Sequence, residues 1–138
     1  MKTMNTRQGG SIMLESLLAI LIFSLGILSI VALLGASIKS TTNAKYRADA
    51  SLLANQVIAS MWIGDKTNAV LISSFASANN GAGYVAWKAN VTSALPGAAA
   101  NPPTITIDSS NRVNVTVFWS VPGESTVNKY LTIAIINS

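Results

Sequence analysis

The sequence of 138 residues contains no cysteine and no histidine, and only 10% of its residues are charged. Without cysteine no disulfide can form, so a folded domain must be held together by packing. Without histidine the chain lacks the commonest general base and metal ligand. The acidic residues stand singly, with no pair at a spacing typical of acid/base catalysis: Glu15, Asp49, Asp65, Asp108 and Glu124. We therefore expect no enzyme, no catalytic residue, no cofactor and no metal site.

Basic residues are too scattered to indicate nucleic-acid binding. The formal net charge is +4, and without the two cations Lys2 and Arg7 the rest of the chain carries +2. No basic cluster with interleaved aromatic residues occurs, although that is the usual footprint of such a surface. We expect no nucleic-acid partner.

An uncharged apolar segment dominates the first third of the chain. Residues 16–38 carry no charge and consist mostly of Leu, Ile, Ala and Val. A helix needs about 20 such residues to cross the ~30 Å hydrocarbon core of a bilayer, so the segment predicts a transmembrane helix and the lipid bilayer as a partner. Glu15 lies three residues into the apolar run that begins at Ile12. A mere membrane anchor gains nothing from an acid there.

The short leader before this segment differs from a secretory signal peptide. A signal peptide places its small-residue cleavage site after its apolar region. Here the only small-residue cleavage point, after Gly10, comes before that region. Cleavage there would remove residues 1–10 and leave Ser11 first and Glu15 fifth in the mature chain. This arrangement, over the leader and about the first 50 residues, resembles the prepilin signal of type IV pilins and of the pseudopilins of type II secretion.

The resemblance implies roles for three residues. A prepilin peptidase would cut between Gly10 and Ser11, and Ser11 would be N-methylated, although members of the family most often begin the mature chain with Phe. In a fibre the Glu15 carboxylate would be buried among helices, where it needs a positive partner. The resemblance implies that this partner is the N-terminal amine of Ser11 in an adjacent subunit.

The resemblance also implies partners and a location. The partners would be the major pilin, other minor pilins and the pilus assembly platform in the bacterial inner membrane. The chain would cross that membrane once, with its head domain in the periplasm, and then enter a pilus on the cell surface. Basic side chains flank the predicted span on both sides and do not decide its orientation. The placement of the head in the periplasm therefore comes from the resemblance.

A helical pattern continues after the apolar segment. Residues 39–63 contain neither Gly nor Pro and keep apolar side chains at three- and four-residue spacings, on Tyr46, Ala50, Leu53, Val57 and Met61, with Ala54 and Ile58 beside them. Polar residues occupy the other side: Lys45, Asp49, Gln56 and Ser60. This pattern predicts an amphipathic helix, which Gly64-Asp65 would end.

Residues 64–138 predict a small α+β head. Residues 64–83 would form a connection with Val70-Leu71-Ile72 and Phe75 as apolar anchors. In residues 84–95 the four-residue spacing of Trp87, Val91 and Leu95 favours a helix. Apolar residues also alternate there, so a strand is the alternative. Residues 98–103 would be a linker.

From Ile105 onward the apolar period is two, which predicts a three-stranded antiparallel meander. Its turns would lie at residues 108–111 and 122–125. One apolar face would rest on the helix stripe from Tyr46 to Met61. That face would carry Ile105, Ile107, Val113, Val115, Val117, Trp119, Val121, Leu131, Ile133 and Ile135. We also expect Trp62, Trp87 and Trp119 in the core.

The expected fold is α+β and pilin-like: a long N-terminal helix, transmembrane in its first half, packed on a small antiparallel head. It comprises a leader (1–10), a transmembrane and assembly helix (11–38), its amphipathic second half (39–63) and the head (64–138). Residues 84–121 further resemble minor pilins of the PilV type. The sequence thus indicates a minor type IV pilin that acts in pilus priming, at the tip or in adhesion. A minor pseudopilin of type II secretion and a membrane-anchored binding domain that never polymerises are the alternatives.

Overall fold

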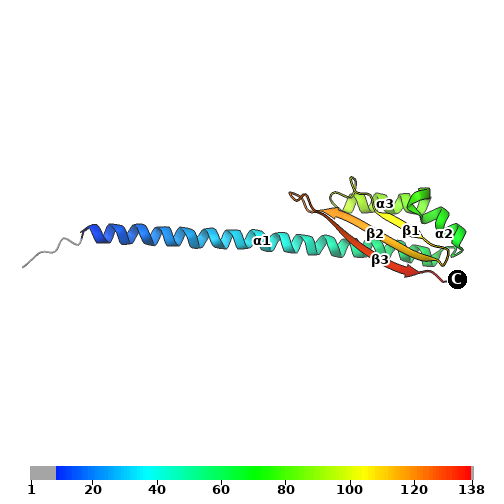
Figure 1. Ribbon diagram of the computed structural model, residues 1–138, viewed down its shortest axis with the longest axis horizontal. Coiled ribbons are helices and arrows are strands. Elements are labelled where there is room, and N and C mark those ends of the chain that lie inside the picture. Colours follow the sequence, from blue (N-terminus) through cyan, green and yellow to red (C-terminus); the bar gives the residue numbers. More distant parts are fainter. Residues whose placement is uncertain (1–8, 138) are drawn as a thin grey trace, which may run out of the picture. The chain divides into compact units, whose positions relative to one another are not determined.

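The computed structural model describes residues 9–137, which form three α-helices, a short 3₁₀-helix and three β-strands (Figure 1). The helices are α1 (Gly9–Ile63), α2 (Asn68–Phe75), η1 (Ser77–Asn79) and α3 (Ala82–Ala94). The strands are β1 (Thr104–Ile107), β2 (Arg112–Ser120) and β3 (Val127–Ile135). The chain divides into two compact units, Met1–Ser40 and Thr41–Ser138, each described by itself below. The expected α+β class, with a long apolar N-terminal helix, is confirmed.

The first unit consists of the apolar part of α1. Every residue from 10 to 40 is exposed, and the helix is long and apolar enough to cross a membrane. The hydroxyls of Ser16, Ser24 and Ser29 donate hydrogen bonds to the carbonyl oxygens four residues earlier, at 2.8, 2.7 and 2.8 Å. Because these polar groups are satisfied within the helix, they do not oppose its burial in lipid.

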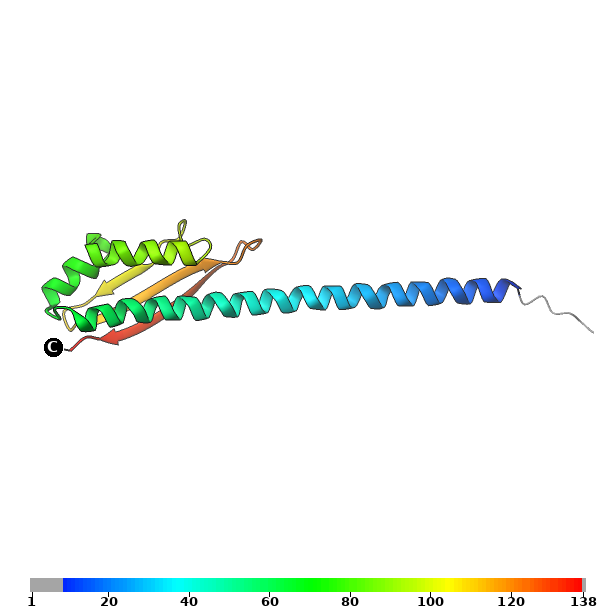
Figure 2. The same ribbon diagram turned by 180° about the vertical axis from the view of Figure 1, so that it is seen from behind.

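The second unit begins with the amphipathic part of α1, and the predicted stripe is confirmed. Its inner residues are buried, namely Ala50, Leu53, Ala54, Val57 and Met61, and Tyr46 and Ile58 pack against them half-buried. The helix ends at Ile63, directly before Gly64 as the sequence predicts. Figure 2 shows this part of α1 in front of the strands.

The three strands form an antiparallel sheet in the order β1-β2-β3, so the predicted meander is confirmed. The odd-numbered residues of β2 face α1 and α3 and are buried, from Val113 to Trp119. Ile105 of β1 lies opposite Val115 and is also buried. These strands therefore present the apolar face that the sequence predicts for them.

The predicted face of β3 is wrong. Leu131, Ile133 and Ile135 are 54%, 56% and 50% exposed. The register sets Tyr130 opposite the buried Val117. Directly opposed residues of antiparallel strands share a face, and a one-residue shift in register reverses every side chain. The inward positions of β3 are therefore the even-numbered ones, Asn128, Tyr130, Thr132 and Ala134.

Helical structure also occupies the predicted connection over residues 64–83. It contains α2 and η1, and of the expected anchors Leu71 is buried while Val70 is 37% exposed. Eight residues give only about two turns of helix, too few for a clear period. Of the two alternatives for residues 84–95, the helix is confirmed and the strand is wrong. The segment lies in α3, which buries Trp87 and Val91.

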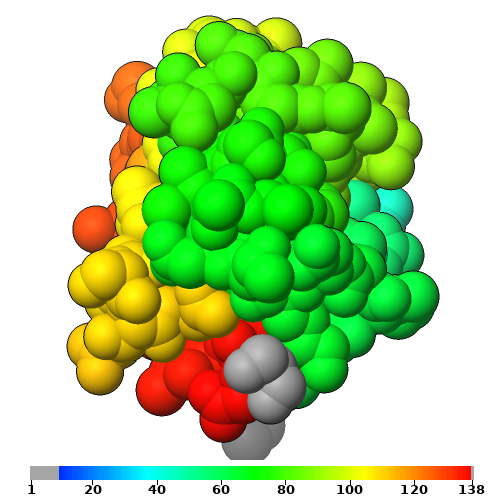
Figure 3. Space-filling model, turned by 90° about the vertical axis from the view of Figure 1, so that its right-hand side faces the viewer, coloured from blue at the N-terminus to red at the C-terminus, as the bar shows by residue number. Residues whose placement is uncertain are grey.

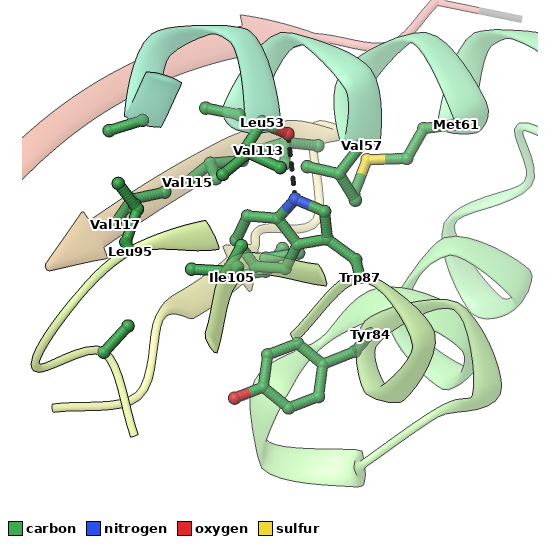
Figure 4. Packing of buried hydrophobic residues seen from close by; sticks show 14 of the residues in the cluster. Leu53, Val57, Met61, Tyr84, Trp87, Leu95, Ile105, Val113, Val115 and Val117 are labelled. Atoms are coloured by element: carbon green, nitrogen blue, oxygen red, sulfur yellow. Dashed lines mark hydrogen bonds between the residues drawn. The ribbon is translucent and has the colours of Figure 1, made fainter. Parts of the chain in front are cut away.

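Trp87 lies at the centre of the core between α1, α3 and the sheet (Figure 4). Its indole N–H donates a hydrogen bond to the Leu53 carbonyl oxygen at 2.8 Å. Trp119 is buried too, and its indole N–H donates to Asn43 Oδ1 at 3.3 Å. The expectation for Trp62 is wrong, because its side chain is 43% exposed and the Lys66 ammonium lies 5.2 Å from its ring centroid.

Candidate functional site

The three site residues predicted from the sequence lie near the start of α1. Gly10, Ser11 and Glu15 are all helical and exposed. Ser11 and Glu15 are four residues apart, so they share one face of the helix. Residues 1–8 of the predicted leader, with Lys2 and Arg7, lie outside the described residues.

No packing contact among the described residues requires glycine at position 10. A Cβ added there would meet no atom within 4 Å. Gly10 is the second residue of α1, so the cost that glycine carries in a helix interior does not apply in full there.

Glu15 is the only charged residue between Gly9 and Ile38. Its carboxylate forms no hydrogen bond or ion pair with another described residue. Its neighbours on α1 include the large apolar side chains of Leu14 and Leu18, which are 70% and 56% exposed. A carboxylate in this position is inexpensive while it remains hydrated, but in an apolar environment it requires a cation or hydrogen-bond donors.

A metal site needs several His, Cys, Asp or Glu side chains close together, whereas Glu15 is the only acidic residue between Gly9 and Ile38. Among residues 9–137, no three His, Cys, Asp or Glu side chains gather closely enough to hold a metal ion. Within the described residues, this end of α1 therefore supplies one carboxylate, that of Glu15.

No protein-family model, curated protein or solved structure matches this chain. The roles of Gly10, Ser11 and Glu15 therefore stay predictions that follow from the resemblance of the sequence to prepilins.

The head contains a polar cluster that the sequence did not reveal. Asn111, in a left-handed conformation with φ 54°, donates hydrogen bonds from Nδ2 to the carbonyl oxygens of Lys66 and Ile136, both at 3.1 Å. Asn68 Nδ2 donates to Asn111 Oδ1 at 2.7 Å and to the Asp108 carbonyl oxygen at 2.8 Å. The cluster joins the segment after α1 to the β1–β2 turn and the end of β3, which meet at the end of the head shown in Figure 3. These bonds give the cluster a structural role.

Two shifted pKa values in the head also have structural causes. The Thr67 backbone N–H donates a hydrogen bond to Asp65 Oδ1 at 2.8 Å and helps to hold the pKa of this carboxyl below its usual range. Burial raises the pKa of Tyr84, whose hydroxyl donates to the Pro103 carbonyl oxygen at 2.8 Å. Both bonds close loops of the head and supply no acid or base to the site on α1.

A groove of about 310 Å³ lies between α1 and α3. It is lined by Gln56, Val57, Ser60, Phe75, Gly83, Ala86, Trp87 and Asn90. None of these side chains titrates near neutral pH, so the groove offers no group for acid/base chemistry.

Proposed function

We propose that this chain is a minor type IV pilin. In this proposal it is made with residues 1–10 as a leader and held in the inner membrane by the apolar part of α1. A prepilin peptidase cuts it after Gly10. The processed chain then enters a pilus, in the priming or tip complex, and its function is assembly or adhesion.

The observation that carries the proposal is the position of Glu15. Within the described residues its carboxylate has no partner, and it is the only charged group on a mostly apolar helix surface as far as Ile38. A chain that only needed an anchor would be more stable in lipid without the acid. An assembled bundle of such helices gives the acid a function, because burial beside a neighbour's N-terminal amine would fix the register between subunits.

The exposed apolar surface of the first unit supports the same proposal. Large side chains along it are between 48% and 72% exposed, from Ile12 to Ile38. Burial of apolar surface is worth roughly 25 cal/mol per Å², so this surface requires lipid or other helices around it. A pilin exchanges the first environment for the second when it leaves the membrane and joins a fibre.

The experiment that tests the function is mass spectrometry of pili sheared from cells that make this chain. We expect peptides that begin at Ser11 in the sheared fraction, and none from cells without prepilin peptidase. If the cut chain stays in the membrane fraction and is absent from sheared pili, the pilus function is wrong. Co-isolation of that cut chain with a type II secretion complex would then identify a minor pseudopilin, and an uncut chain would identify an anchored domain.

A further inference from the structure

The two edges of the sheet differ in how they are protected. At one edge β1 has four residues, and its outward side chains are Thr104 and Thr106. The hydroxyl of Ser77 in η1 donates a hydrogen bond to the Ile105 carbonyl oxygen at 3.0 Å, which closes part of this edge. A short, polar and covered edge strand is how natural proteins avoid unwanted strand pairing.

The opposite edge, formed by β3, is longer and less polar. β3 has nine residues (Figure 1). Its backbone from Val127 to Ile135 has hydrogen-bond partners only in β2 among the described residues. In an antiparallel ladder every second residue directs its N–H and C=O away from the neighbouring strand. The free side of β3 therefore offers a row of unpaired donors and acceptors.

The outward face of the same strand is apolar. Val127, Leu131, Ile133 and Ile135 are 44%, 54%, 56% and 50% exposed. Their spacing is the strand period of two, which places them in one row. An apolar row beside an unpaired backbone edge has both requirements of strand addition: main-chain hydrogen bonds for affinity, and alternate side chains for specificity.

Lys129 interrupts this row and indicates what kind of strand fits. It is exposed and has no ion pair or side-chain hydrogen bond within the described residues. Among the outward residues from Val127 to Ile135 it is the only charged one. A second copy of β3 would place Lys129 opposite another Lys or an apolar residue in every antiparallel register that matches the outward faces. A lysine on an edge strand is a known means of preventing such self-pairing.

We propose that β3 is the docking edge for an extended strand of a different protein. That strand runs antiparallel to β3, places apolar side chains opposite Leu131 and Ile133, and places a carboxylate opposite Lys129. Opposite charges across neighbouring strands attract, and like charges repel. The lysine thus selects an acidic partner and rejects a second copy. This inference concerns the head and does not depend on the proposed function.

The test uses the full chain in lipid nanodiscs and two labelled synthetic strands. The first strand is Thr-Ile-Thr-Val-Thr-Val-Thr-Glu-Thr, in which Ile, the two Val and Glu face Ile135, Ile133, Leu131 and Lys129. In the second strand Lys replaces Glu. Fluorescence anisotropy should show that the wild-type chain binds the Glu strand roughly threefold to tenfold more tightly than the Lys strand. Empty nanodiscs give the background from lipid.

Three variants define the outcome. Lys129→Glu should reverse the preference between the two strands, whereas Lys45→Glu, the same charge change on an exposed part of α1, should leave it unchanged. The double variant Leu131→Thr, Ile133→Thr should weaken binding of both strands, and its circular dichroism should remain that of the wild type because both side chains are exposed. The proposal is overturned if Lys129→Glu leaves the preference unchanged, if binding does not exceed that of empty nanodiscs, or if the wild-type chain cross-links to itself through β3.

Discussion

At the scale of single residues, Glu15 is the only charged side chain on a helix surface that is mostly apolar from Ile12 to Ile38. Its free energy therefore depends on what surrounds that surface. Near a hydrated membrane edge the ionised carboxylate costs little, whereas at the centre of a span it costs about 2.5–3.5 kcal/mol on insertion scales. Among packed helices it is tolerated only beside a cation. A role of Glu15 should thus appear only when subunits assemble.

Glu15→Ala tests this dependence. We expect the variant to be made, inserted and cut after Gly10 at near-normal levels, yet to be missing from sheared pili, because a neighbour's amine would be left unpaired in an apolar bundle. Ser24→Ala serves as the control, since its hydroxyl bonds only to the Ile20 carbonyl of its own helix. Immunoblots of membrane and sheared fractions provide the measurement. Normal incorporation of the Glu15→Ala chain would remove the main argument for a pilin.

Gly10→Val tests processing. A prepilin peptidase that accepts only a small side chain before the cut should leave this variant at full length in the membrane. Gly26→Val is a matched control, because an added Cβ meets nothing within 4 Å at either glycine. We expect the control to be cut normally. Intact-mass measurement distinguishes the forms, and loss of residues 1–10 from the Gly10→Val chain would contradict the assigned cleavage point.

At the scale of elements, the amphipathic part of α1 supplies one wall of the core. Leu53 is 9% exposed and its carbonyl oxygen accepts the Trp87 hydrogen bond, while its neighbour Leu52 is 58% exposed. Leu53→Ala should lower the free energy of unfolding by about 2–5 kcal/mol through lost burial and a cavity. Leu52→Ala should change it by less than about 0.5 kcal/mol. Urea denaturation followed by tryptophan fluorescence measures both, and equal effects would show that the docking face of α1 is wrongly assigned.

Two glycines in turns of the head allow a similar comparison. Gly97 and Gly123 have φ of 77° and 85°, a region that costs other residues roughly 1–2 kcal/mol. At Gly97 an added Cβ would also lie 2.8 Å from Ser120 Oγ and 3.0 Å from the Ser120 nitrogen, whereas at Gly123 it would meet nothing within 4 Å. Gly97→Ala should therefore be the more destabilising substitution in thermal denaturation. The reverse order would mean that Ser120 does not limit the space beside Gly97.

Helices and strands with a strong apolar period could be predicted from the sequence. Which of their faces is buried could also be predicted where only one face is apolar. The stripe from Tyr46 to Met61 has a single period and a single available face, so its burial followed directly. For β3 the alternation gave the correct strand but the wrong face. That face depends on the register between Val117 and Tyr130, which the loop over residues 121–126 determines. Even and odd loop lengths give opposite faces, and no local pattern reports which one the loop adopts.

The functional and structural polar residues also differ in whether the sequence could predict their positions. The positions of Gly10, Ser11 and Glu15 relative to the apolar segment are properties of the sequence, and the structure adds that all three are exposed on one helix. The polar cluster around Asn111 could not be predicted, because Asn68 and Asn111 are 43 residues apart and meet only through the tertiary fold. Long-range contacts of this kind leave no periodic signal in a sequence.

At the scale of the whole molecule, the two units differ in how far their apolar side chains are buried. The first unit buries none of its residues from 10 to 40. All residues of the buried core cluster lie between Ala50 and Ile136. The second unit therefore holds a complete core, whereas residues 10–40 of the first contribute nothing to it. Removal of the first unit should leave the core intact.

A chain shortened to residues 41–138 tests this independence. We expect it to be soluble and to unfold cooperatively in urea, because it keeps every core residue and the Asn43 acceptor for Trp119. Leu53→Ala should destabilise it as much as the full chain, since all residues of the core cluster are kept. A chain that starts at Asn55 is the control: it lacks Ala50, Leu53 and Ala54 and should not fold, because the sheet loses much of its cover.

Near-ultraviolet circular dichroism reports the packing of Trp87 and Trp119. If residues 41–138 show helix and strand without that signal, the head needs the rest of α1 for its packing, and the division into two independent units is wrong.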